Sequence, residues 1–83
     1  MEKTIYTREY AIVLRLLREA REQAGMTQVQ LAEKLHQSQS FISKFERGDR
    51  RIDIIQLRTI CYILGVSLRD FIDRLERELT KSG

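Results

Sequence analysis

The chain lacks several kinds of residue on which other classes of protein depend. Its 83 residues include no proline and no tryptophan, and only one cysteine and one histidine. One cysteine cannot close an internal disulfide, and with one histidine it cannot supply the three or four ligands of a typical zinc site. These absences exclude a disulfide-rich scaffold and argue against a metal centre, and the lone Cys61 suits a reducing compartment. We expect no metal and no other cofactor.

Long apolar runs are missing as well. No stretch approaches the roughly 18 consecutive apolar residues of a membrane span, and we expect no signal peptide at the start of the chain. The apolar segment nearest the start, residues 11–14, is interrupted by Arg15. We therefore expect a cytoplasmic protein without a membrane partner.

The excess of positive charge is small and unevenly distributed. The formal net charge is +3, and the excess is densest from Lys34 to Arg51, where five cations stand with two acids. A local excess of cations is typical of surfaces that meet a polyanion, but by itself this one is a weak indication.

The residues that begin and end helices recur in a regular pattern. In three places a short polar residue precedes an acidic or amide residue by three positions, as in a capping box: Thr27 with Gln30, Asp53 with Gln56, and Ser67 with Asp70. Three of the four glycines follow helical patterns, where a residue in the left-handed conformation commonly ends a helix.

Apolar periodicity agrees with these boundaries. Apolar residues recur at i, i+3, i+4 and i+7, and no segment alternates with period two for long enough to indicate a strand. We predict a single all-α domain over residues 1–83, a compact bundle of five helices at about 7–24, 28–35, 39–47, 54–64 and 68–80.

The second and third predicted helices are separated only by residues 36–38. Two short helices joined by three or four residues form a helix-turn-helix, whose second helix lies in the major groove of DNA. Residues 38–48 read SQSFISKFERG, and on a helix Phe41, Ile42 and Phe45 fall on one side. We expect this apolar side to anchor the helix on the domain, and the polar side to face a partner.

The run TQVQLAEKLHQSQSFISKFERG resembles the helix-turn-helix of the Xre-type family, the phage lambda repressor and Cro-like proteins. The motifs that carry the resemblance are Gly25-Met26-Thr27-Gln28, Leu31-Ala32, Ile42-Ser43, Phe45-Glu46-Arg47-Gly48 and Leu64-Gly65-Val66-Ser67-Leu68. The resemblance covers about residues 14–72 and implies a bundle of lambda-repressor-like type.

Two positions depart from the family pattern. His36 stands where glycine usually makes the turn, and Ile52 stands where proline is common before the fourth helix. Histidine is among the few residues other than glycine that are enriched at positive φ, so His36 can still make the turn. Neither change removes a group that would contact DNA.

The resemblance implies roles for the polar side of the recognition helix. It identifies the groove-facing positions as candidates for reading bases, namely Gln39, Ser40, Ser43 and Lys44. Glutamine can bind adenine at N6 and N7, lysine can bind guanine at O6 and N7, and serine can bind several base edges. The alternative is an ordinary solvated helix face, with Ser38 as the N-cap.

Four further residues are expected beside the phosphate backbone: Gln28, Arg47, Arg50 and Arg51. Gln28 opens the second helix, where free backbone N–H groups attract phosphate, and the arginines follow the recognition helix. Such contacts set register and affinity without carrying direct sequence information. The alternative for Gln28 is an ordinary polar residue at the first position of the helix, and for each arginine it is a place in a solvated loop.

Glu46 requires its own explanation, because an acid beside DNA is repelled. In the family an arginine late in the first helix pairs with this glutamate, and Arg21 holds that position here. We expect a structural ion pair between them. His36 and Cys61 are interpreted as a turn residue and a small core residue, not as a catalytic or metal-binding pair.

Several apolar residues remain after the core stripes are assigned: Ile5, Ile12, Leu16, Tyr62, Ile63, Leu75 and Leu79. On the fifth helix Leu68, Ile72, Leu75 and Leu79 are spaced as a seam. We expect a two-fold homodimer that uses this seam, with the N-terminal segment, Tyr62 and Ile63 contributing. The alternative is that these residues only extend or cap the core.

The leading hypothesis is a sequence-specific double-stranded DNA-binding transcriptional regulator that acts as a repressor or by placing polymerase. Its homodimer would bind a near-palindromic site. The alternative keeps the fold but assigns an antitoxin-like or other regulatory subunit, which acts mainly through a protein partner such as a toxin. The sequence shows no acid–base pair, activated nucleophile or phosphate-cradling glycine loop, so we do not expect an enzyme.

Overall fold

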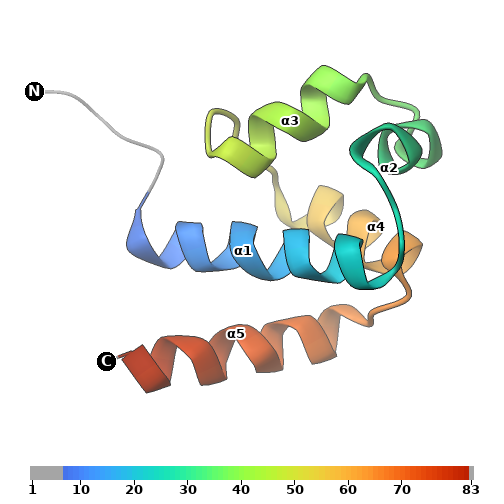
Figure 1. The fold of residues 1–83 in the computed structure, drawn as a ribbon. Helices are drawn as coiled ribbons and strands as arrows, with labels where there is room; N and C mark the ends of the chain where they lie inside the picture. The colour runs from blue at the N-terminus through green and yellow to red at the C-terminus, as the bar shows by residue number, and fades with distance from the viewer. Residues whose placement is uncertain (1–6, 83) are drawn as a thin grey trace, which may run out of the picture.

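Five helices joined by short turns make up the structure (Figure 1). The computed structural model describes residues 7–82, so the expectations for Ile5 and the stretch before Thr7 lie outside the described residues. The helices are α1 (Arg8–Gln23), α2 (Gln28–Leu35), α3 (Gln39–Arg47), α4 (Ile54–Leu64) and α5 (Leu68–Ser82). Residues 7–82 contain no strand, and the predicted all-α fold is confirmed.

The helix starts follow the capping residues seen in the sequence. Thr27 and Asp53 each form a complete capping box with the glutamine three positions later. The Ser67 hydroxyl accepts a hydrogen bond of 3.0 Å from the N–H of Asp70. These side chains satisfy backbone N–H groups that the first turn of a helix leaves without a helical acceptor.

The turn between α2 and α3 depends on one left-handed residue. His36 ends α2 with φ 57° and ψ 41°, in the position where glycine is usual. Its N–H donates to the carbonyl of Glu33, and the N–H of Gln37 donates to the carbonyl of Ala32. The left-handed conformation costs histidine more than glycine. Histidine nevertheless makes the turn, as predicted.

Helix α1 lies between α3 and α5 (Figure 1), and α4 contacts it as well. Two ion pairs join α1 to α5: Arg15 with Glu78 at 2.8 Å, and Glu19 with Arg74 at 3.7 Å. Because the residue later in α1 meets the residue earlier in α5, the two helices run antiparallel. The pairs therefore set the register of α5 on the bundle.

The core takes apolar side chains from all five helices. Leu16 is only 1% exposed, so it belongs to the core, although the helical pattern left it outside the core stripes. The physical reason is that α1 is covered by three other helices and needs more than one apolar stripe. Cys61 is buried in the core as predicted, and this burial raises the pKa of its thiol to about 11.

Candidate nucleic-acid interface

Helix α3 has one buried face and one exposed face. Phe41, Ile42 and Phe45 are buried, and the rings of the two phenylalanines meet edge to face with centroids 5.7 Å apart. On the other face, the side chains of Gln39 and Lys44 are exposed. Burying an aromatic side chain contributes on the order of 2 kcal/mol, so the buried face holds the helix firmly while its polar face stays open.

The four residues predicted to read bases have different surroundings. Gln39, Ser40 and Lys44 are exposed, whereas Ser43 is half-buried. The hydroxyl of Ser43 accepts a hydrogen bond of 2.9 Å from Nη1 of Arg47, one turn later on the same helix. Ser43 is therefore already engaged at the edge of the exposed face.

Two glutamines link the first turns of α2 and α3. The amide Nε2 of Gln39 donates to Oε1 of Gln28 at 2.8 Å, and Nε2 of Gln28 donates to Oε1 of Glu46 at 2.9 Å. Each amide thus donates one N–H group to the next side chain in this series of hydrogen bonds. The series runs toward Glu46, because a carboxylate can only accept hydrogen bonds. Sequence reasoning placed Gln28 and Gln39 at the interface but missed this connection.

Glu46 is paired with Arg21, as the resemblance suggested. Arg21 donates from Nε to Oε2 of Glu46 at 2.7 Å and from Nη2 to Oε1 at 3.2 Å. A third bond of 2.8 Å joins Nη1 of Arg21 to the carbonyl oxygen of Met26, in the turn between α1 and α2. The side chains are only 11% and 6% exposed. One ion pair therefore connects α1, this turn and α3 beneath the interface.

The arginines that follow the recognition helix are held by different contacts. Arg47 donates from Nε to Oδ2 of Asp49 at 3.0 Å, so part of its charge is balanced locally. The guanidinium carbon of Arg50 lies 4.8 Å from the ring centroid of Phe41, and that of Arg51 lies 4.9 Å from the ring centroid of Tyr10. The sequence did not reveal the contacts with Asp49, Phe41 or Tyr10, which depend on how the loop folds back.

The residues expected to form a dimer are only partly available. Tyr62 is 83% exposed. The other five are half-buried, and four of them pack against the core of their own chain: Ile63, Leu68, Ile72 and Leu75. Because α5 lies along α1, the apolar side chains of its seam are partly buried against the domain's own core and partly exposed at the surface.

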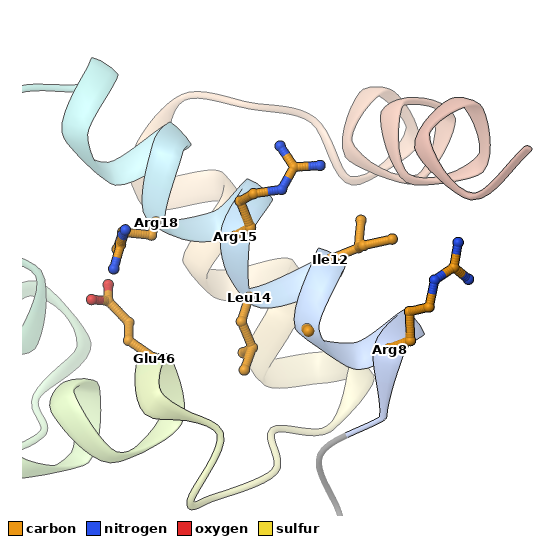
Figure 2. A pocket seen from close by; sticks show the side chains of 7 residues that line it. Arg8, Ile12, Leu14, Arg15, Arg18 and Glu46 are labelled. Carbon is orange, nitrogen blue, oxygen red and sulfur yellow. The ribbon is translucent and has the colours of Figure 1, made fainter. Parts of the chain in front are cut away.

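An open groove of about 540 Å³ follows α1 (Figure 2). Its lining side chains include Arg8, Arg15 and Arg18 from α1 and Glu46 from α3, whose carboxylate lies near Arg18 in the view. Hydrogen bonds from Arg15 to Glu78 and Glu19 raise the pKa of Arg15. Among the residues that line the groove, Arg15 is paired with Glu19 and Glu78, and the acid Glu46 is paired with Arg21.

Two further findings concern the described part of the chain. Residues 7–82 hold no group of three or more His, Cys, Asp or Glu side chains that could bind a metal ion. None of the described helices is both long enough and apolar enough to cross a membrane. His36 is an exposed turn residue, and Cys61 is buried within α4.

The two short helices joined at a left-handed residue, with the second helix anchored by its buried face, define a helix-turn-helix protein. The family model described as helix-turn-helix matches residues 17–71, which is most of the chain. The chain belongs to the Xre-type helix-turn-helix family, as its motifs predicted. Among curated protein sequences none matches.

Solved structures give the same assignment. An XRE-family like protein from Pseudomonas syringae pv. tomato str. DC3000 is 40% identical over 84% of this chain and 85% of its own, with a TM-score of 0.80. The restriction-modification controller protein C.Esp1396I, solved as a tetramer with its natural 35 base-pair operator, is 31% identical over 90% of this chain and 99% of its own, with a TM-score of 0.80. The clp gene regulator ClgR from Corynebacterium glutamicum is 25% identical over 92% of this chain and 81% of its own, with a TM-score of 0.78.

Proposed function

We propose that the chain is a sequence-specific double-stranded DNA-binding transcriptional regulator that places α3 in the major groove. The observation that carries this proposal is the fixed, exposed start of α3. Gln39 projects from a helix whose opposite face is buried, and its amide is held by Gln28 at 2.8 Å. A side chain oriented before binding loses less conformational entropy when it meets a base.

Base reading is assigned to Gln39, Ser40, Ser43 and Lys44. Gln39 keeps its carbonyl oxygen and one N–H group beyond the bond to Gln28, which is the donor and acceptor pair that adenine N6 and N7 require. Ser43 acts with Arg47, because the two side chains are already hydrogen-bonded. The stretch SQSFISKFERG thus combines an anchoring side with a side that reads bases.

Phosphate binding is assigned to Gln28, Arg47, Arg50 and Arg51. Gln28 lies in the first turn of α2, where the free backbone N–H groups and the positive end of the helix dipole favour an anion. The ion pair with Arg21 and the bond from Gln28 offset the charge of Glu46, so this acid does not repel the DNA. Because counterions are released from the phosphates, affinity should fall steeply as salt rises.

The proposal includes a homodimer in the cytoplasm. The controller protein C.Esp1396I binds its operator as a tetramer, and helix-turn-helix dimers place two recognition helices about 34–36 Å apart on one side of the duplex. Tyr62 supplies the exposed aromatic group, and the half-buried residues Ile63, Leu68, Ile72, Leu75 and Leu79 are assigned to the same interface. Such a dimer would select a near-palindromic site.

Selection of bound sequences from random double-stranded DNA, with the solution mass measured beside it, tests this proposal. The expected result is a near-palindromic consensus and a dimer mass. Gln39→Ala and Lys44→Ala should change or weaken the selected consensus, while the matched control Thr80→Ala, at an exposed position of α5, should reproduce the wild-type result. A chain that enriches no sequence, or whose consensus survives both substitutions, would overturn the assignment.

A further inference from the structure

The loop between α3 and α4, residues 48–53, carries Arg50 and Arg51, two of the proposed phosphate contacts. Both ends of this loop are held by helix caps. The N–H of Asp49 donates to the carbonyl of Lys44 at 2.9 Å, and Asp53 opens α4 with a capping box. The two arginines lie between these caps. The positions of their side chains therefore depend on the contacts that hold the middle of the loop.

The hydroxyl of Tyr10, from α1, reaches the middle of this loop. It accepts a hydrogen bond of 3.2 Å from the N–H of Ile52 and donates one of 3.4 Å to the carbonyl oxygen of Arg50. A phenol can donate and accept at once, so one side chain satisfies two backbone groups of the loop. These bonds bridge 42 and 40 positions of sequence and tie the loop to the first helix.

The ring of Tyr10 makes a second contact with the same loop. The guanidinium carbon of Arg51 lies 4.9 Å from its centroid, within the range of a cation–π interaction. Arg50 is placed in a comparable way on Phe41, at 4.8 Å. A guanidinium stacked on a ring has fewer rotamers to lose when it binds a phosphate.

We infer that Tyr10 is a positioning residue for phosphate binding: its hydroxyl fixes the backbone of the α3–α4 loop and its ring holds Arg51. The inference rests on the proposed function, because it concerns how the loop and Arg51 are positioned within the same DNA interface. Tyr10 lies outside residues 17–71, the part of the chain that matches the family model. It does not itself need to touch DNA.

Two substitutions separate the two contacts. Tyr10→Phe removes the hydroxyl and keeps the ring, and Tyr10→Leu removes both. The probe is a mixed-sequence duplex at low salt, since phosphate binding is independent of sequence. We expect Tyr10→Phe to weaken binding about two- to tenfold, the range for one or two net hydrogen bonds. Tyr10→Leu should weaken it further and reduce the slope of log affinity against log salt by about one, as loss of a phosphate contact does.

A stability control separates positioning from folding. Val13→Ala removes part of a half-buried apolar side chain on the same helix and leaves Tyr10 in place, so we expect it to lower the melting temperature with little effect on DNA binding. All proteins are compared below their melting transitions. If Val13→Ala weakens DNA binding and flattens the salt slope as much as Tyr10→Leu does, a general loss of stability explains the effect and the inference is overturned.

A double variant tests the connection to Arg51 directly. Arg51→Gln should weaken binding in the wild-type background and cause little further loss in the Tyr10→Leu background. Equal losses in both backgrounds, or a Tyr10→Leu protein that binds as the wild type does, would overturn the inference while the proposed function stands. A wild-type chain that binds no duplex at low salt would overturn the proposed function, and the inference with it.

Discussion

The ion pair beneath the recognition helix makes the sharpest prediction about stability. Glu46→Ala removes the carboxylate that accepts two hydrogen bonds from Arg21, at 2.7 and 3.2 Å, and one from Gln28 at 2.9 Å. Arg21 keeps only its bond to the carbonyl of Met26 from this group of contacts. Since Arg21 is 9% exposed, water cannot freely replace the lost carboxylate.

The expected cost is large for a domain of this size. Removing one partner of a buried ion pair costs about 3–5 kcal/mol, because the remaining charge is left buried and uncompensated. Domains of this length lose roughly 4–8 °C of melting temperature for each kcal/mol, so we expect a fall of about 12 °C or more. The matched control is Glu22→Ala: Glu22 is exposed and lies 3.9 Å from Arg18, a surface pair that contributes about 0–1 kcal/mol.

Thermal melts and urea titrations followed by circular dichroism measure both costs. The double variant Arg21→Ala, Glu46→Ala should lose less than the sum of the two single variants, because it leaves no unpaired charge. Glu46→Gln should fall between the wild type and Glu46→Ala, since an amide can still accept hydrogen bonds but carries no charge. A Glu46→Ala melting temperature within the range of the Glu22→Ala control would refute the reasoning.

Three further predictions concern other parts of the fold. Burial raises the pKa of the Cys61 thiol from 9.0 to about 11. The stability that the buried neutral thiol contributes is therefore complete below pH 9 and is lost as pH rises toward 11. Native Cys61 should resist alkylation at pH 8 and react once the chain is unfolded. His36→Gly should raise the melting temperature, with a gain of about 1 kcal/mol, because the left-handed conformation at φ 57° costs glycine little. Tyr62→Glu should shift the sedimentation mass from dimer to monomer with little change in the melting temperature, since Tyr62 is exposed.

Each of these three predictions has a control measurement and a result that would contradict it. Rapid alkylation of native Cys61 at pH 8 would contradict its burial, and a thiol in the unfolded chain supplies the reference rate. For the turn, His36→Ala should lower the melting temperature, so equal melts for the alanine and glycine variants would contradict the strain at this position. For the dimer, Leu75→Glu is a poor first test because Leu75 packs against the core and its loss destabilises the monomer. A Tyr62→Glu protein that keeps the dimer mass would remove Tyr62 from the interface.

The local signals in this sequence predict the secondary structure closely. A capping residue such as Thr27 or Asp53 acts within a few positions of itself, so its effect can be read without knowing the rest of the fold. The same holds for His36, whose tolerance of positive φ is a property of the residue. Leu16 was misassigned because one helix pattern cannot show how many neighbours will cover it.

The sequence alone determined the five helices, the helix-turn-helix between α2 and α3, and the polar residues that α3 exposes, because all of these follow from contacts over a few positions. Tertiary structure decided which of these residues are connected. The family resemblance predicts the pair of Arg21 with Glu46, but not the hydrogen bonds that continue from Glu46 through Gln28 to Gln39, nor the contact of Tyr10 with the loop around Arg51; these contacts join residues 11 to 42 positions apart. Such contacts arise only when separate helices pack together, and no local pattern encodes their distances.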